Sequence, residues 1–279
     1  MKRLLVIGIG AGDPDHLTLQ AVKALNRADA FFLLDKGEEK RDLVRLRRRI
    51  LEEHARGPYR VIEARDPDRD RTAPAYTEAV DDWRGRRADV VEALVRDELG
   101  DSETGAFLVW GDPGLYDSTL PVLEEILGRG TVRFEYEVVP GISSVSALAA
   151  RHRTGLTRVG RPLRITTGRR LAERLPEGAE DVVVMLDAQG AFMRAAREKD
   201  EKDNDLDIFW GAYLGTPDEI LIAGPVREVA ERILEARAEA RERKGWIMDT
   251  YLLRSRARSP RRWSPRRWSP RRGSPDPGE

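Results

Sequence analysis

Four loops in the sequence could bind a ligand through their main-chain groups. Each follows an apolar run, and the first three lead into a segment with helical spacing. Their sequences are GIGAGDP at residues 8–14, GDPGLYDS at 111–118, VPGISSVSALA at 139–149 and YLGTP at 213–217. Glycine allows the backbone to approach a ligand closely, and free N–H groups at a helix start can point at it. Since ligands of α/β sheets lie beyond the carboxyl ends of the strands, the loops are expected to converge on one cleft.

The first loop leaves two interpretations open. It resembles a dinucleotide fingerprint, but the G-x-G-x-x-G pattern needs a third glycine where Asp13 stands. A carboxylate beside the phosphates would repel them. Asp35, at the end of the second expected strand, could still take the place of the ribose-binding acid. An NAD-dependent oxidoreductase therefore stays as an alternative, and each loop taken singly could be an ordinary tight turn.

Composition excludes several other kinds of chemistry. The 279 residues contain no cysteine, which excludes disulfides, a thiolate nucleophile and a Cys-ligated zinc site. The three histidines are far apart in the sequence. We expect no metal centre. No apolar run approaches the roughly 18 residues of a membrane span, and no cleavage site follows the short run at residues 2–7. We expect a soluble cytoplasmic protein without a membrane partner.

The zero net charge is the sum of two unlike parts. The last 25 residues hold eight arginines and two acids, so the preceding 254 carry 41 basic and 47 acidic residues, a net of −6. An acidic body argues against binding nucleic acid over its whole surface. If its ligand is anionic, its basic residues should gather at the cleft.

Alternation of apolar runs with helical spacing predicts an α/β fold of two domains. In the first part, strands are expected at residues 4–9, 31–34, 59–63 and 106–110, with helices at 18–28, 42–54 and from 76 to about 94. This order predicts a mostly parallel sheet with helices on both faces. A second α/β layer with some antiparallel pairing would follow, with strands at 132–139, 163–166, 182–186, 207–214, 220–223 and 246–253, and helices at 118–127, 143–151 and 226–243. We place the domains at 1–117 and 118–254. The basic side chains of the second helix are expected on its solvated face; they are Arg45, Arg47, Arg48 and Arg49.

Residues 255–279 differ in kind from the rest of the chain. Three proline-containing pentamers, RRWSP, RRWSP and RRGSP, block helix and strand formation and offer no core. We expect this tail to be disordered. Its arginines and tryptophans could bind nucleic acid, but a neutral low-complexity extension is the simpler interpretation.

The motifs resemble those of the tetrapyrrole (corrin/porphyrin) methylases. They are the 8–12 loop with Leu17 and Thr18, then GDP at 111–113, VPGIS at 139–143 and VM at 184–185. Within this family the closer similarity is to members that methylate precorrin-5 at C-1 and release acetate, on stretches such as FLVWGDP at 107–113, WGAYLG at 210–215 and GWIMDTYLL at 245–253. The resemblance covers residues 1–254.

The resemblance implies two αβα domains with S-adenosyl-L-methionine in the cleft between them, usually in a homodimer. Carried over motif by motif, it assigns cofactor contacts to Gly10, Ala11, Gly111, Asp112, Leu115, Ser143, Ser144, Met185, Leu214 and Gly215. Many relatives have proline at the position of Ala11 and threonine at that of Ser143. Another precorrin methyltransferase of the same family stays an alternative.

The implied reaction has two events. Methyl transfer from a sulfonium needs alignment of donor and acceptor more than a nucleophilic side chain. Removal of the acyl fragment by water would need a proton acceptor and donors to the oxyanion. We expect these among Asp35, Tyr116 and His152, with Asp249 as a further candidate. Substrate carboxylates would be bound by Lys36, Arg153 and Arg169.

Overall fold

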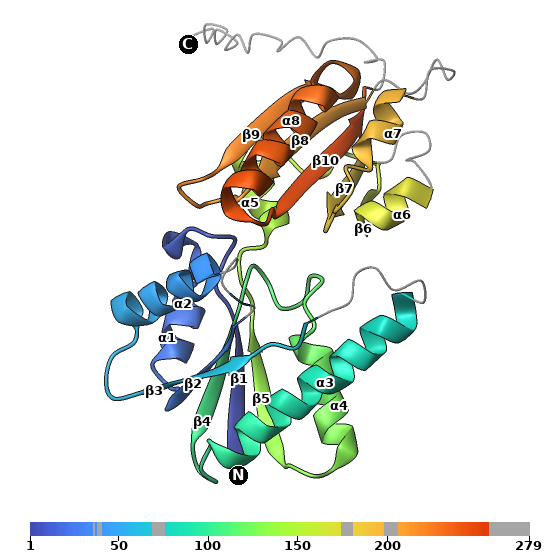
Figure 1. Ribbon diagram of the computed structural model, residues 1–279. Coiled ribbons are helices and arrows are strands. Elements are labelled where there is room, and N and C mark those ends of the chain that lie inside the picture. The colour runs from blue at the N-terminus through green and yellow to red at the C-terminus, as the bar shows by residue number, and fades with distance from the viewer. Residues whose placement is uncertain (36, 38–40, 69–75, 174–180, 198–205, 257–279) are drawn as a thin grey trace, which may run out of the picture.

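The computed structural model describes residues 1–35, 37, 41–68, 76–173, 181–197 and 206–256. It contains two five-stranded sheets, one above the other in Figure 1. The mixed α/β class with two sheets, expected from the sequence, is confirmed. The expected disorder of the tail concerns residues that mostly lie outside the described ranges.

The first sheet is parallel and has the strand order β3-β2-β4-β1-β5. Its strands are β1 (Lys2–Gly8), β2 (Ala30–Asp35), β3 (Arg60–Arg65), β4 (Thr104–Val109) and β5 (Phe134–Val139). The last five residues of β1 are all buried, because helices cover both faces of the sheet. One face packs on α1 (Leu19–Leu25) and α2 (Arg41–His54), and the other on α3 (Tyr76–Asp97) and α4 (Thr119–Arg129).

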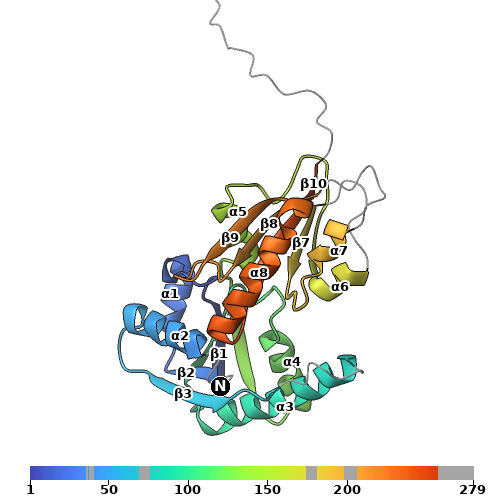
Figure 2. The same cartoon turned by 45° about the horizontal axis from the view of Figure 1, so that its top comes forward.

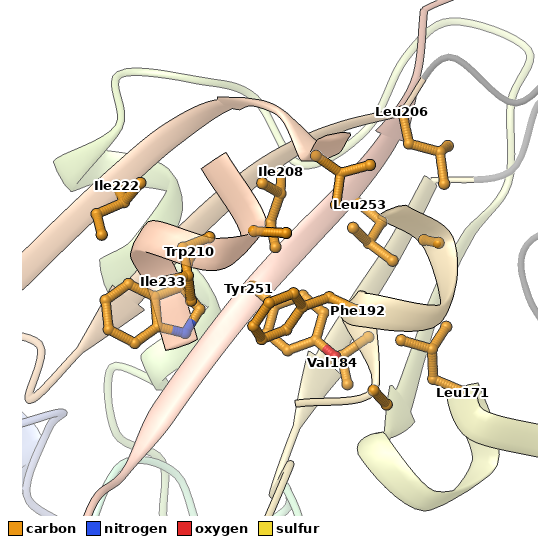
Figure 3. Packing of buried hydrophobic residues seen from close by; sticks show 14 of the residues in the cluster. Leu171, Val184, Phe192, Leu206, Ile208, Trp210, Ile222, Ile233, Tyr251 and Leu253 are labelled. Carbon is orange, nitrogen blue, oxygen red and sulfur yellow. The ribbon is translucent and has the colours of Figure 1, made fainter. Parts of the chain in front are cut away.

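The second sheet is mixed, with the order β6-β7-β10-β8-β9. Its strands are β6 (Leu163–Thr167), β7 (Asp181–Met185), β8 (Leu206–Ala212), β9 (Ile220–Pro225) and β10 (Asp249–Ser255). Only the β6–β7 pair is parallel. Helix α5 (Ser144–Arg151) packs on one face. The other face carries α6 (Gly168–Glu173), α7 (Phe192–Arg197) and α8 (Val226–Lys244), over a core that includes Trp210, Tyr251 and Phe192 (Figure 3).

The expected domain boundary after residue 117 is wrong as a division between the sheets. β5 pairs with β1 along its whole length, and α4 packs on α3, so the chain up to residue 139 belongs to the first sheet. The expected boundary before the tail is also too early. Ser255 closes β10, and its carbonyl accepts a hydrogen bond from Arg158 (3.0 Å).

The carboxyl ends of the first sheet face the second sheet. Lys244, at the end of α8, connects the two units: its Nζ donates to Asp42 at the start of α2 (2.9 Å) and to Asp218 (2.5 Å). Figure 2 shows this end of α8 reaching down towards the first sheet. The loops that follow β1, β4 and β5 are thereby placed beneath the second sheet.

Candidate functional site

The first two glycine loops bind each other through their backbones. Gly10 and Gly111 form an isolated antiparallel bridge, with the Gly111 N–H donating to the Gly10 carbonyl (2.8 Å) and the Gly10 N–H to the Gly111 carbonyl (3.3 Å). Both glycines have a positive φ, 83° and 73°, which few other residues adopt without strain. The ends of β1 and β4 are therefore joined without any side chain between them.

Asp112 attaches the third loop to the second. One of its carboxylate oxygens accepts the N–H of Gly141 (2.9 Å), and the other accepts that of Gly114 (2.8 Å). Gly141 also lies so close that an added Cβ would stand 2.1 Å from the Gly111 carbonyl oxygen. Ser143 then caps α5 by accepting the N–H of Ser146 (3.2 Å).

The fourth loop reaches the first from the second sheet. A Cβ on Gly12 would lie 2.5 Å from the Leu214 carbonyl oxygen, and one on Gly215 would lie 2.8 Å from the Asp13 nitrogen. Ser144 is tied to the same sheet, because its Oγ accepts from the Thr250 hydroxyl (3.0 Å). The four loops therefore converge, as their shared position after strands predicts.

An apolar cluster continues this junction between the sheets. Ala11 and Leu214 are buried in it, and Leu115 and Met185 pack against it. The ten expected cofactor residues therefore form two adjoining groups: this cluster, and the loop backbone with its glycines, its serines and Asp112.

Three strained residues stand beside this cluster. Tyr116, Leu186 and Tyr213 have φ values of 51°, 55° and 49°, in the left-handed region that non-glycine residues rarely occupy. They adjoin Leu115, Met185 and Leu214 respectively. Three of the four described non-glycine residues with such a φ therefore lie at this junction, and the fourth, Arg153 (52°), follows the far end of α5. Backbone strain of this kind concentrates at functional sites.

A cavity of about 1090 Å³ opens beside the junction, between α2, the first loop, the 213–219 loop and the end of α8. Two buried nitrogen atoms in its wall, Nε1 of Trp246 and Nδ1 of His16, have no hydrogen-bond partner among the described residues. Trp246 packs edge-on against Tyr213, with 5.1 Å between ring centroids. Such buried polar atoms are suited to a ligand that offers acceptors or donors.

The charges of this cavity wall are balanced, which differs from the expected basic cleft. Arg45, Arg49, Arg151 and Lys244 line it together with Asp13, Asp42, Glu52, Asp218 and Glu219. Each of the four cations is already bound to a carboxylate. The cavity therefore gives little attraction for a polyanion.

Two of the three expected catalytic residues lie at the facing edges. Asp35 ends β2 at the carboxyl edge of the first sheet, and its Oδ1 accepts the Gly37 N–H (2.9 Å). The Tyr116 hydroxyl donates to the Ile165 carbonyl of β6 (3.3 Å), and the residue keeps 47% of its surface exposed. Burial raises the pKa of this phenol above its usual value.

His152 and Arg153 lie elsewhere, which argues against their expected roles. His152 caps the far end of α5, with Nε2 on the Trp210 carbonyl (3.0 Å) and its ring against Phe209. Burial lowers its pKa. Arg153 begins a turn whose next residues are held by Arg254, five positions along β10 from the cleft. An α5 helix starting at the loops necessarily carries its last residues away from them.

The remaining candidates have mixed outcomes. Lys36 lies outside the described residues. Arg169 is exposed at the start of α6, directly beyond β6. Asp249 is buried under α8 in an ion pair with Arg237, and Nε1 of Trp210 donates to it (2.8 Å). Burial raises its pKa to about 6 against these partners, and its place in the core gives it a structural role.

A polar cluster beyond β2, β3 and β4 was not foreseen. Arg87 is 8% exposed and pairs with the buried Asp66 (3.2 Å). Arg47, expected on the solvated face of its helix, turns inward instead, and its Nε donates to the Leu108 carbonyl (2.9 Å). Burial lowers the pKa of Arg47 to about 10, while the charge of Asp117 opposes this shift. The sequence signal for this cluster was the position of Arg87 four residues after Trp83, which places it on the buried stripe of α3.

The described residues offer neither a metal site nor a membrane-spanning helix. No group of three or more histidine, aspartate or glutamate side chains in them is arranged to hold a metal ion. No described helix is long and apolar enough to span a membrane.

Comparison with known proteins gives a consistent result. Residues 3–230 match the family Tetrapyrrole (Corrin/Porphyrin) Methylases. A precorrin-6A synthase (deacetylating) from Sinorhizobium sp is 50% identical over 258 residues, covering 92% of this chain and 97% of that protein. The crystal structure of a cobalamin synthesis related protein from Corynebacterium diphtheriae is 38% identical, with a TM-score of 0.75 and coverage of 91% and 98%. A uroporphyrin-III C-methyltransferase from Thermus thermophilus, complexed with S-adenosyl homocysteine, shares the fold at a TM-score of 0.54 and 20% identity, covering 90% and 91%.

Proposed function

The chain belongs to the tetrapyrrole (corrin/porphyrin) methylase family, and from this premise we propose that it converts precorrin-5 into precorrin-6A. In this reaction a methyl group passes from S-adenosyl-L-methionine to C-1 of the ring, and water then releases the acyl fragment as acetate. The observation that carries the proposal is the convergence of the four loops, with the ten expected cofactor residues, at one junction. The Sinorhizobium relative, similar over nearly its whole length, carries the name of this activity.

The residues present fit S-adenosyl-L-methionine. The glycines let the four loops pack backbone against backbone, and the main-chain groups of the loops would hold the polar parts of the cofactor. The apolar wall of Ala11, Leu214 and Met185 would hold the flat and apolar parts of the cofactor. The unpartnered Nε1 of Trp246 would donate a hydrogen bond to it. Acidic residues in two of the loops, Asp13 and Asp112, favour a cationic cofactor over the pyrophosphate of NAD.

When bound, S-adenosyl-L-methionine supplies an activated methyl group on a cationic sulfur. The protein's own part is to align the ring carbon with that methyl group and to exclude water until transfer is complete. In the second event Asp35 would accept a proton from water, and the Tyr116 hydroxyl would donate to the oxyanion of the acyl group. Arg169 would bind a substrate carboxylate. The proposal also takes the enzyme to be a cytoplasmic homodimer, as the family resemblance implies.

The direct test is incubation with precorrin-5 and methyl-labelled S-adenosyl-L-methionine, following both label and acetate. We expect equal amounts of transferred label and released acetate. Label transfer without acetate would instead indicate another precorrin methyltransferase. Titration with NAD is the matching control, and binding of NAD without S-adenosyl-L-methionine would overturn the proposal.

Asp35→Asn separates the two events, since it removes a proton acceptor but keeps the hydrogen bond to Gly37. We expect methyl transfer to continue and acetate release to slow by about 10²-fold or more, as for loss of a general base. Equal slowing of both events would exclude the assigned role of Asp35.

A further inference from the structure

Leu186 combines two unfavourable features on one residue. It follows directly after β7, its backbone is left-handed with φ at 55°, and 60% of its surface is exposed. The left-handed conformation is energetically unfavourable for leucine, and an exposed leucine side chain buries too little apolar area to offset that cost. Neither feature helps the isolated chain to fold, so the position calls for a reason outside folding.

The residue after it explains how the conformation is held. Asp187 is buried, with 4% of its surface exposed, and its carboxylate accepts four hydrogen bonds. The donors are the N–H groups of Gln189 (3.1 Å), Gly190 (2.9 Å) and Ala191 (2.7 Å) and the hydroxyl of Tyr251 (2.7 Å). A carboxylate bound in this way cannot move without leaving buried donors unpaired.

Two further contacts fix the backbone of Asp187. The Arg237 guanidinium donates to its carbonyl oxygen (2.6 Å), and Gly168 packs so closely that a Cβ there would lie 2.5 Å from the Asp187 carboxyl carbon. The turn after Leu186 is thus determined from several sides. Leu186 has no freedom to relax its φ or to fold back into the core.

The surroundings of Leu186 show what it could contact. Behind it, Met185 packs into the apolar cluster that also holds Leu115. Beside it, Thr167 of β6 pairs with Met185, and two residues later Arg169 is exposed. Tyr116 reaches the same strand from the first sheet, through the Ile165 carbonyl, and is itself half-exposed with a left-handed backbone. An apolar side chain, a phenol ring and a guanidinium therefore surround the ends of β6 and β7.

We propose that Leu186 is a substrate-positioning residue whose side chain packs against the flat face of the tetrapyrrole ring. The inference rests on the proposed function and extends it to a residue that the loop motifs do not reach. A broad ring with carboxylates on its rim needs an apolar support at its face and cations at its edge. Leu186 supplies the support, and Arg169 beside it meets a rim carboxylate.

Leu186→Asn and Leu186→Gly test this role without disturbing the backbone. Asparagine is close to leucine in size and tolerates a left-handed conformation, and glycine adopts it freely. With either variant we expect KM for precorrin-5 to rise at least fivefold. The kcat should stay within twofold of the wild type, and Kd for S-adenosyl-L-methionine should not change. The melting temperature of the glycine variant should not fall. Val159→Asn, at a fully exposed apolar residue in the loop before β6, is the matched control and should leave KM unchanged.

The outcomes separate this inference from the proposed function. Wild-type turnover of precorrin-5 with an unchanged KM in both Leu186 variants would overturn the positioning role alone. Wild-type protein that binds S-adenosyl-L-methionine but fails to methylate precorrin-5 would reject the proposed function instead. A rise in KM that the Val159 control shares would also contradict the inference, because the effect would then come from any exposed apolar residue.

Discussion

Glycines at the junction act mainly by allowing the backbones of different loops to contact each other. Their types and positions after strands were enough to predict ligand-binding loops. The sequence could not show that Gly141 rests on Gly111 from another loop, because that contact depends on three strands being neighbours. The same holds for Arg47 and His152, whose neighbours come from other elements.

Gly141→Ala should abolish binding of S-adenosyl-L-methionine. The added Cβ would stand 2.1 Å from the Gly111 carbonyl oxygen, and backbone on both sides prevents the small shift that would relieve it. We expect affinity to fall more than 100-fold, measured by calorimetric titration. Gly128→Ala, where the structure has nothing within 4 Å, should instead stabilise α4 by about 0.5–1 kcal/mol. Normal binding by the Gly141 variant would show that the loops adjust to each other.

His152→Gln should change the pH dependence of stability more than turnover. Burial lowers the pKa of His152 in the folded state below its ordinary value of 6.5. Its contribution to stability is therefore fully present above pH 6.5 and is lost as the pH falls below that value. Urea unfolding at pH 7.5 and 5.5 should show a smaller difference for the glutamine variant than for the wild type. A kcat reduced more than tenfold would restore His152 as a catalytic residue.

The periodicity of the sequence predicted the long helices but not the short ones. Helices α2, α3 and α8 run for 14, 22 and 19 residues and match their expected positions within a few residues. α6 and α7 have six residues each, too few for an apolar period to be recognised. α7 instead owes its position to Asp187, whose carboxylate accepts the N–H groups of the two residues just before its start. A buried tertiary contact of this kind leaves no local pattern.

Tyr251→Phe tests how much the hydrogen bonds to Asp187 stabilise this part of the structure. Removing the hydroxyl takes one donor from the buried Asp187 carboxylate while leaving the ring packed edge-on against Phe192. We expect the free energy of unfolding to fall by about 1–3 kcal/mol, since a buried charged acceptor loses a partner. Denaturant titration measures it, with Tyr136→Phe on the edge strand β5 as the control. An unchanged stability would mean that the main-chain donors alone hold Asp187.

At the scale of the molecule, the sequence predicted two α/β units but misplaced their boundary. After α4, β5 could have started a new sheet or closed the first, and its alternating pattern suits an edge strand in either. Only pairing with β1 decides between them. The balanced cavity wall has a similar cause. The carboxylates that pair with its cations come from spacing on a helix, from the facing unit or, for Arg151, from the loop before β9. Net charge alone therefore says little about where an anionic substrate lies.

The tail should be separable from catalysis if the chain is cut at the right residue. β10 extends to Ser255, and Arg256 pairs with Asp207 (2.7 Å), so a cut after residue 254 would damage the second sheet. Residues 257–279 hold seven arginines and two acids, and a chain ending at Arg256 therefore keeps a net charge of −5.

We expect this shortened chain to retain its melting temperature and to keep kcat/KM for precorrin-5 within twofold, because every residue assigned to the site lies before the cut. Binding of the full chain to single-stranded RNA at low salt, if present, should be lost on truncation, since seven arginines supply the counterion release that drives such binding. RNA binding that survives truncation would place it on the acidic body. A fivefold loss of turnover would give the tail a part in the reaction itself.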